Sequence, residues 1–320
     1  MKYLTRLTYL VFLLAPILAS AHYPEKPIRM ILPYSSGGGA DVIGRPLAME
    51  LTKILGKSVF AENRGGASGN IAMEYVANSA PDGYTIILML TAQAAVNNTL
   101  FKDSKIDAIK DFEPISLIAK APYFLAINPS VPAKNIQEFI TLIRNNPGKY
   151  SYASTGNGSG THLSMVLLKS ISQLDILHVT YKGGGGAYTD LLSGQVDASF
   201  VGAGSAKGFI QNGQIRLLAV TTPQRSPIYP EVPTLAESGV TGYSSEVWYA
   251  LFAPKGTPPA IIKKLNSAVL VALKSPQLKE RYVADSIQTI GSTPEELTAF
   301  TKTERIKWAQ MVGRLSSANE

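Results

Sequence analysis

The sequence of 320 residues contains no cysteine and three histidines. Without cysteine the chain forms no disulfide, so its stability must come from burial of a hydrophobic core. Three histidines, one of them at position 22, are too few to suggest a transition-metal site. We therefore expect neither a metal nor another cofactor.

Motifs of nucleotide-binding and nucleic-acid-binding proteins are missing as well. The phosphate-loop pattern GxxxxGK[ST] does not occur, and Gly156, Gly158 and Gly160 depart from the spacing of a dinucleotide-binding loop. The net charge of +7 is mild and scattered, with no basic run interleaved with aromatic residues. Nucleic acid is therefore not an expected partner.

No serine of the sequence has an evident catalytic base. Ser159 and Ser68 lie in glycine-rich segments, but a nucleophilic serine needs a base beside it. His162 follows Ser159 by three residues at the same predicted helix start, a poor position for reaching back to the hydroxyl. His178 is interpreted as a structural residue of a strand. We expect no enzyme, and an exported hydrolase or isomerase with a serine-based site stays open as an alternative.

Residues 1–21 are typical of a secretion signal. Lys2 and Arg6 precede an apolar run over 10–18, and residues 19–21 are small, as a signal peptidase requires. The apolar run is too short to cross a bilayer, which takes about 20 residues. The predicted mature chain has 299 residues and a net charge of +5, lies in the periplasm, and is long enough for two domains.

One stretch, residues 27–55, sets the pattern for the rest of the chain. A short apolar run over 28–32 predicts a strand buried on both faces, and apolar residues at helical spacing over 43–55 predict an amphipathic helix. The residues between them, 35–40, have only small side chains or none. A helix start behind such a turn offers free N–H groups and the positive end of the helix dipole, which together favour an anion.

The pattern of strand, small-residue loop and helix recurs along the chain. Loops at 35–40, 65–69, 155–161 and 183–186 each follow a predicted strand. Alternating strands and helices predict an α/β fold with mostly parallel sheets, in which ligands bind beyond the carboxyl ends of the strands. We expect one domain over 22–122 and 248–320 and a second over 123–247, joined by crossing strands, with two loops from each domain facing a cleft.

Short motifs along the whole mature chain, taken in order, resemble the Bug family, the periplasmic receptors of tripartite tricarboxylate transporters. They lie at 33–41, 62–69, 81–84, 178–183, 194–197, 230–234 and 248–258. The resemblance implies a two-domain Venus-flytrap fold of the type II periplasmic binding proteins. It also implies a monomeric receptor for a small carboxylate, which it delivers to the membrane subunits of the transporter. A sensory module that presents its ligand to a membrane kinase would share this fold, and it stays open as a second alternative.

The resemblance also assigns the binding site. In the family one carboxylate is held by backbone groups and two ordered waters at two loops, which here are Ser35, Ser36, Gly37, Gly38, Gly39, Gly66, Ala67, Ser68 and Gly69. The other end of the ligand faces the second domain, here Thr155, Gly158, Ser159, Thr161 and Tyr181, with Ala203 and Gly204 nearby.

The chemical class of the carboxylate stays open between a dicarboxylate or tricarboxylate, an amino acid and an aromatic acid, which would stack on Tyr34 or Tyr181. Ser36 and Gly65 stand where the family often has proline, a departure that bears on the water-mediated arrangement. Asp41 and Arg64 are interpreted as supports of the loops, because a carboxylate aimed at the ligand would repel it.

The leader is predicted to be cleaved between Ala21 and His22. Intact-mass measurement of the protein purified from the periplasm of an expressing bacterium should give the mass of residues 22–320. A periplasmic protein that still carries Lys2 and Arg6 would contradict this prediction.

Overall fold

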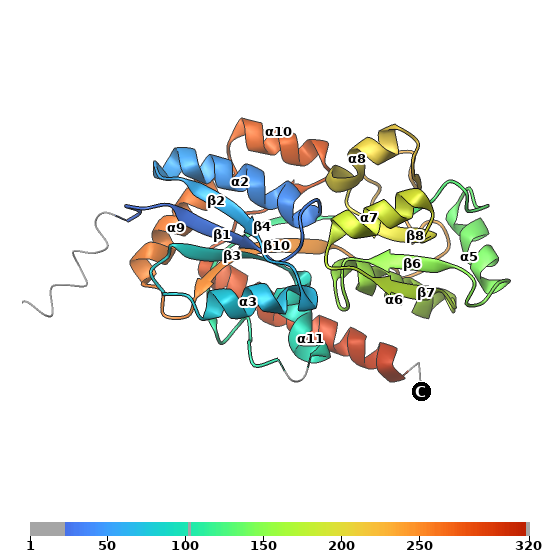
Figure 1. Cartoon of the computed structure of the whole chain (residues 1–320), viewed down its shortest axis with the longest axis horizontal. Helices are drawn as coiled ribbons and strands as arrows, with labels where there is room; N and C mark the ends of the chain where they lie inside the picture. Colours follow the sequence, from blue (N-terminus) through green and yellow to red (C-terminus); the bar gives the residue numbers. More distant parts are fainter. Residues whose placement is uncertain (1–22, 102–103, 318–320) are drawn as a thin grey trace, which may run out of the picture.

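In the computed structural model, which describes residues 23–101 and 104–317, the strands form two separate sheets (Figure 1). The strand order is β11-β4-β10-β3-β1-β2 in the six-stranded sheet and β7-β6-β8-β5-β9 in the five-stranded sheet. We call the halves built on these sheets the first and the second domain. The predicted leader lies outside the described residues.

The first domain takes its elements from both ends of the chain. Its strands are β1 (Ile28–Leu32), β2 (Val59–Asn63), β3 (Thr85–Leu90), β4 (Phe112–Ala121), β10 (Val247–Pro254) and β11 (Gln288–Thr289). Its helices are α2 (Gly39–Leu55), η1 (Ala67–Gly69), α3 (Asn70–Ala77), η2 (Ala92–Val96), α4 (Asn97–Leu100), α9 (Pro259–Ala272), α10 (Pro276–Ala284) and α11 (Pro294–Ser317).

The second domain is built from the middle of the chain. Its strands are β5 (Phe124–Ile127), β6 (Ser151–Ser154), β7 (Leu177–Thr180), β8 (Ala198–Val201) and β9 (Arg216–Val220). Its helices are α5 (Ile136–Arg144), α6 (Gly160–Ser172), α7 (Gly184–Ser193) and α8 (Ala203–Gln211).

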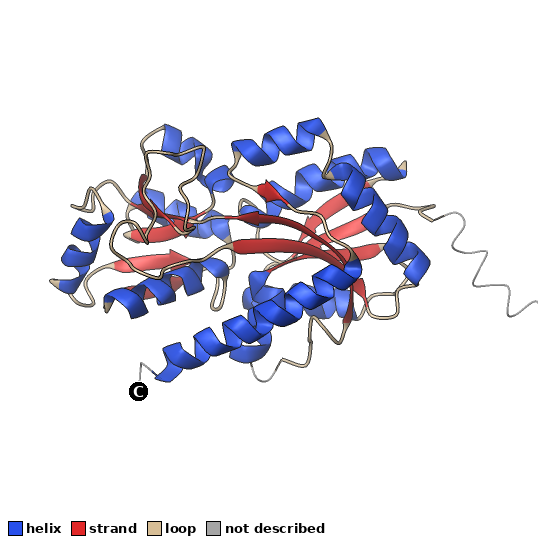
Figure 2. Cartoon of the chain, turned by 180° about the vertical axis from the view of Figure 1, so that it is seen from behind, coloured by secondary structure: helices blue, strands red, loops and turns tan. Residues whose placement is uncertain are grey.

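The two faces of the first sheet are both covered, which confirms that β1 is buried on both sides. Met30 belongs to the core cluster that includes Leu47 of α2 and Leu265 of α9, whereas its neighbour Ile31 belongs to a second cluster, which includes Met73 of α3. Figure 2 shows the long helix α11 running across this second face. None of the described helices has both the length and the apolar character needed to cross a bilayer.

The expectation of mostly parallel sheets needs a correction, because both sheets are mixed. The strands of the βα units are parallel, in the order β2-β1-β3 in one sheet and β7-β6-β8 in the other. The strands next to the crossings, β4, β5 and β10, pair antiparallel with their neighbours. β5 enters the second domain from the cleft and β10 re-enters the first domain from it, so each runs away from the cleft, whereas the strands of the βα units run towards it.

One buried residue, Thr221, forms hydrogen bonds that join the two segments connecting the sheets, from β4 to β5 and from β9 to β10. Thr221, which directly follows β9, accepts a hydrogen bond from Tyr123 N at its Oγ1 (2.9 Å) and donates its own N–H to Tyr123 O (3.0 Å). Its carbonyl accepts from Ser245 N at 3.1 Å, just before β10. The two connecting segments therefore lie side by side. The predicted boundary at 122/123 falls in the first of these segments, whereas that at 247/248 falls after the first residue of β10; both stay predictions.

Candidate functional site

The glycine-rich loops of the two domains meet at the carboxyl ends of their strands. Ser35 N donates to Lys182 O at 3.2 Å, and Ser35 forms an isolated parallel β-bridge with Gly183. Ser68 Oγ of the first domain donates to the carbonyl of Asn157 in the second. The structure is therefore in a closed form, in which hydrogen bonds join the domains.

This closure depends on glycine residues at the points where the two domains touch. A Cβ atom added to Gly184 would lie 3.0 Å from Gly38 Cα, and one added to Gly185 would lie 3.0 Å from Ser36 O, both closer than side chains normally approach. At Gly65 an added Cβ would lie 2.8 Å from Ser35 N and 3.1 Å from Lys182 O. Glycine at these positions lets the main chains of the two domains come into contact.

Behind the loops lies a cavity of about 50 Å³, which we call the hinge cavity because the crossing segments line it. Such a volume holds roughly three to five water molecules. Its polar lining comes from the helix starts described below, four tyrosines, two threonines and one aspartate. Its apolar wall consists of Val42, Ile43, Leu90, Ala121, Pro122, Val247 and Ile287.

Four helices point their N-termini at the hinge cavity. The lining residues include Gly38, Gly39 and Ala40 at the start of α2, Gly160 and Thr161 of α6, Gly184 of α7, and residues 202–205 at the start of α8. The first turn of a helix has N–H groups without intrahelical acceptors, and its dipole places partial positive charge there. The cavity is therefore a favourable environment for an anion, although no lysine, arginine or histidine is part of its described lining.

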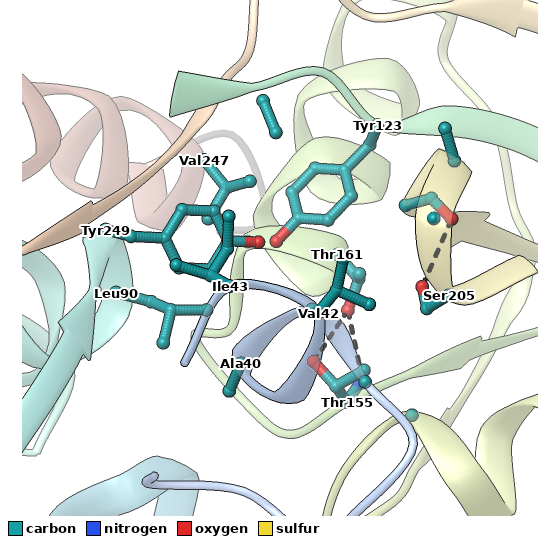
Figure 3. A pocket seen from close by; sticks show the side chains of 18 of the residues that line it. Ala40, Val42, Ile43, Leu90, Tyr123, Thr155, Thr161, Ser205, Val247 and Tyr249 are labelled. Atoms are coloured by element: carbon teal, nitrogen blue, oxygen red, sulfur yellow. Dashed lines mark hydrogen bonds between the residues drawn. The ribbon is translucent and has the colours of Figure 1, made fainter. Parts of the chain in front are cut away.

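Four tyrosine rings surround the same space: Tyr34, Tyr123, Tyr188 and Tyr249. Figure 3 shows the hydroxyls of Tyr123 and Tyr249 directed towards one another inside the cavity. Burial raises the pKa of Tyr34 to about 12 and that of Tyr123 well above its usual value. These phenols stay protonated at neutral pH and can act as hydrogen-bond donors.

A second space, the loop cavity, lies closer to the loops and has a volume of about 260 Å³. Its lining comes from 66–68 of the first domain and from 155–157 and 180–182 of the second. Tyr34 and Thr155 line both cavities. Lys182, on the exposed rim, is the one cation in the described part of the lining.

The predicted site residues fall into three groups. Those on the hinge cavity are Tyr34, Gly38, Gly39, Thr155, Thr161, Ala203 and Gly204. The loop cavity has Gly66, Ala67, Ser68 and Tyr181, besides Tyr34 and Thr155. Outside both linings are Ser35, Ser36, Gly37, Gly69, Gly158 and Ser159. Ligand contact by any of these residues stays a prediction.

Ser159 and Tyr181 use their hydroxyls within the second domain. Ser159, almost fully buried, accepts from His162 N at 3.3 Å and so caps α6, and its Oγ lies 3.0 Å from Thr161 Oγ1. Thr161 Oγ1 in turn accepts from Thr155 N at 3.0 Å. Tyr181 donates to Asp190 at 2.5 Å. Figure 3 shows the Thr155–Thr161 bonds at the floor of the cavity.

The interpretation of Asp41 as a loop support is confirmed by its hydrogen bonds, whereas that of Arg64 stays a prediction. Asp41 accepts from Gly37 N at 3.0 Å and from Arg45 Nε at 2.7 Å, which fixes the first loop against α2. Arg64 donates to Glu62 at 2.7 Å and lies 3.6 Å from the centre of the Tyr75 ring. Both charges are therefore engaged beside the loops.

Gln93, a fully buried residue in the π-helical turn η2, is a residue of the site that the sequence pattern does not predict. Its Nε2 donates to Tyr34 Oη at 2.9 Å and to Ser68 O at 2.6 Å, and its Oε1 accepts from Leu90 N at 3.0 Å. One side chain thus joins the first two loops. The signal for it is a single glutamine in the apolar stretch 85–96.

The start of α8 is a second feature that the local sequence pattern does not indicate, since residues 202–205 are all small. Gly202 caps a helix of nine residues whose first turn lines the hinge cavity. The small residues Gly-Ala-Gly-Ser have the composition of a turn, and the helix forms because Ala203 and Ala206 are buried against the core.

His162 and His178 form a stack inside the second domain, at a centroid distance of 4.4 Å. Gly158 N donates to His162 Nδ1 at 3.0 Å, and His178 Nε2 lies 2.6 Å from Ser154 Oγ. Ser154 is fully buried, so this pair is structural, as predicted for His178. In the part of the chain that the structure describes, no group of three or more acidic or histidine side chains is placed to hold a metal ion.

Comparison with known families and proteins relates the chain to the receptors of tripartite tricarboxylate transporters. The model of a family described as tripartite tricarboxylate transporter family receptor matches residues 43–316. Protein BugT from Bordetella pertussis is 35% identical over 299 residues, which are 93% of this chain and 91% of that protein.

Two similar solved structures contain a bound acid. A protein from R. palustris solved with adipate has a TM-score of 0.89 and 32% identity, over 92% of this chain and 98% of that one. MatC from Rhodopseudomonas palustris, with bound malate, has a TM-score of 0.87 and 30% identity, over 91% and 100%. The two sheets therefore form the type II periplasmic-binding-protein fold, and the relatives are solute-binding proteins rather than enzymes.

The histidine stack predicts a loss of stability in acid. Burial, followed by the charges of His178 and Lys169, lowers the pKa of His162 to about 4, against about 6.5 in an unfolded chain. The folded state therefore binds this proton less well than the unfolded state. Its contribution, at most about 3 kcal/mol, is present above pH 6.5 and is lost as the pH falls towards 4.

Urea unfolding at pH 7.5 and pH 5.0 measures this loss, and His162→Asn should lose less stability between the two pH values than the wild type. Equal losses in both proteins would contradict the prediction.

Proposed function

Since this chain belongs to the tripartite tricarboxylate transporter family of receptors, we propose that it captures a small carboxylate between its two domains and delivers it to the membrane subunits of such a transporter. In this proposal the receptor acts as a monomer in the periplasm, after removal of residues 1–21. The domains meet at the predicted boundaries 122/123 and 247/248 and close on the ligand by bending there.

The observation that carries the proposal is the convergence of four helix starts on one enclosed space. Each helix start favours a nearby anion by roughly 0.3–1 kcal/mol, and by up to about 2 kcal/mol when partly buried. Charge-assisted hydrogen bonds from N–H groups add about 1.5–3 kcal/mol each. A few such contacts reach the roughly 8 kcal/mol of a micromolar complex after the cost of ordering the ligand.

The relatives support a carboxylate as the ligand, because two of them were solved with adipate and malate. We propose that one ligand carboxylate binds N–H groups of Ser36, Gly38, Gly39 and 66–68, because the N–H groups of Ser35, Gly37 and Gly69 are already hydrogen-bonded within the protein. The remainder of the ligand extends past Thr155 and Thr161 towards Ala203 and Gly204. The hydroxyls of Ser68 and Ser159 are already engaged in the closed form, so the backbone supplies most donors.

A thermal-shift screen of small carboxylic acids tests the proposal. A ligand present at 100 times its Kd should stabilise the folded state by about 2.7 kcal/mol. The screen should include dicarboxylates, amino acids and aromatic acids, with the matching amides as uncharged controls. A chain that no acid stabilises, or that the amides stabilise equally, would contradict carboxylate capture.

The contact of Gly38 with Gly184 predicts the effect of a side chain at the cleft. Gly38→Val places a branched side chain where the two backbones approach, so closure is blocked and affinity for the acid found in the screen should fall at least tenfold. The matched control is Gly208→Val in α8, since an added Cβ at Gly208 has no neighbour within 4 Å. Calorimetric titration beside a melting curve measures both effects. A folded Gly38→Val protein with the affinity of the wild type would contradict the proposal that backbone N–H groups at this loop hold the ligand carboxylate.

A further inference from the structure

Asp285 is the one charged side chain among the described residues that line the hinge cavity. It follows α10 in the first domain and lies against the start of α8 in the second. A Cβ atom added to Gly204 would lie 2.8 Å from Asp285 Oδ2. The Asp285 side chain is 12% exposed, so its carboxylate is largely withdrawn from solvent.

This carboxylate is compensated by the partial positive charge at the start of α8 and by one side chain. Its polar partner among the described residues is Lys207, whose Nζ is 3.8 Å from Oδ1 and also donates to Ala284 O at 3.4 Å. Burial raises the pKa of Asp285, and Lys207 and Arg281 act in the opposite direction. Buried carboxylates are normally paired or fully hydrogen-bonded, because their desolvation is costly. Oδ2 therefore remains open to a donor supplied from the cavity.

The surroundings of Asp285 favour a cation as that donor. The rings of Tyr34, Tyr123, Tyr188 and Tyr249 border the same cavity, and aromatic faces attract cationic groups. The helix starts of α2, α6 and α7 favour an anion at the same time, whereas the start of α8 already faces Asp285. The hinge cavity thus combines helix starts that favour a carboxylate with the negative charge of Asp285, which favours a cation.

We propose that Asp285 makes the site selective for short amino carboxylates, with the ligand carboxylate at the helix starts and its ammonium group against Asp285. A dicarboxylate of the same length would bring its second negative charge to an existing one, which disfavours it. This inference rests on the proposed function and names the ligand class of the same site. The small volume of the closed hinge cavity, about 50 Å³, limits the ligand to a short chain.

Asp285 also belongs to a contact between the domains, which offers a competing role. Lys207 of α8 pairs with it, and Ser226 Oγ of the second domain lies 2.6 Å from Ser286 Oγ of the first. If Asp285 only held the closed form together, its removal would weaken every ligand by the same factor. If Asp285 instead sets selectivity, its removal changes the ratio between the Kd values of an amino carboxylate and a diacid. The two roles therefore give different results.

The experiment uses pairs of probes with equal spacers: glycine and malonate, β-alanine and succinate, 4-aminobutyrate and glutarate. Calorimetric titration gives the Kd of each probe for the wild type, Asp285→Asn and Lys207→Met, with melting curves as the folding check. Asp82→Asn is the matched control, because Asp82 pairs with Lys26 on the surface and is absent from the cavity lining.

For at least one spacer, the wild type should bind the amino carboxylate at least tenfold more tightly than the diacid. Asp285→Asn should reduce or reverse this preference for the amino carboxylate. Asp82→Asn should leave the preference unchanged, and Lys207→Met should not lower it. An unchanged ratio in Asp285→Asn, or a wild type that prefers the diacid at every spacer, would overturn the inference and leave carboxylate capture standing. Absence of binding by either class to every protein would overturn the inference, and the screen of carboxylic acids then decides whether carboxylate capture stands.

Discussion

The contact between glycine backbones across the cleft is the constraint on which the closed structure depends. Gly37 and Gly38, just before α2, meet Gly184 and Gly185 of α7, and a Cβ atom added to either α7 glycine would lie 3.0 Å from backbone atoms of the first loop. Because the main chains meet there, the helix starts behind them come close enough to enclose one cavity. Gly65 extends this contact to the second loop, since a side chain at that position would strike Ser35 and Lys182.

The rest of the structure holds these loops in position with buried polar groups. Gln93 joins Tyr34 to the Ser68 carbonyl, Asp41 fixes the first loop to its own helix, and Thr221 holds the two crossings together. Each of these side chains satisfies backbone groups that would otherwise be unpaired, and none of the three lines the hinge cavity or the loop cavity. The loops are therefore preorganised, so binding needs little ordering of the protein.

Much of the architecture could be predicted from the sequence, because the βα units carry strong local signals. The apolar run 28–32, the helix after it and the recurring small-residue loops all lie where they were expected. The mixed pairing of the sheets could not be read, since pairing direction depends on how β4 and β10 pass between domains. Gln93 and Asp285 reach the site only through the tertiary fold, and residues 202–205 have the composition of a turn although they begin α8. Local pattern shows none of these three contributions.

The central claim is that one ligand carboxylate is held by helix starts of both domains inside a closed cleft. A crystal structure with a stabilising acid tests it most directly. The account predicts carboxylate oxygens at hydrogen-bond distance, about 2.7–3.2 Å, from N–H groups of both domains, directly or through one water. A ligand bound to one domain alone, or lying outside the hinge and loop cavities, would contradict the account.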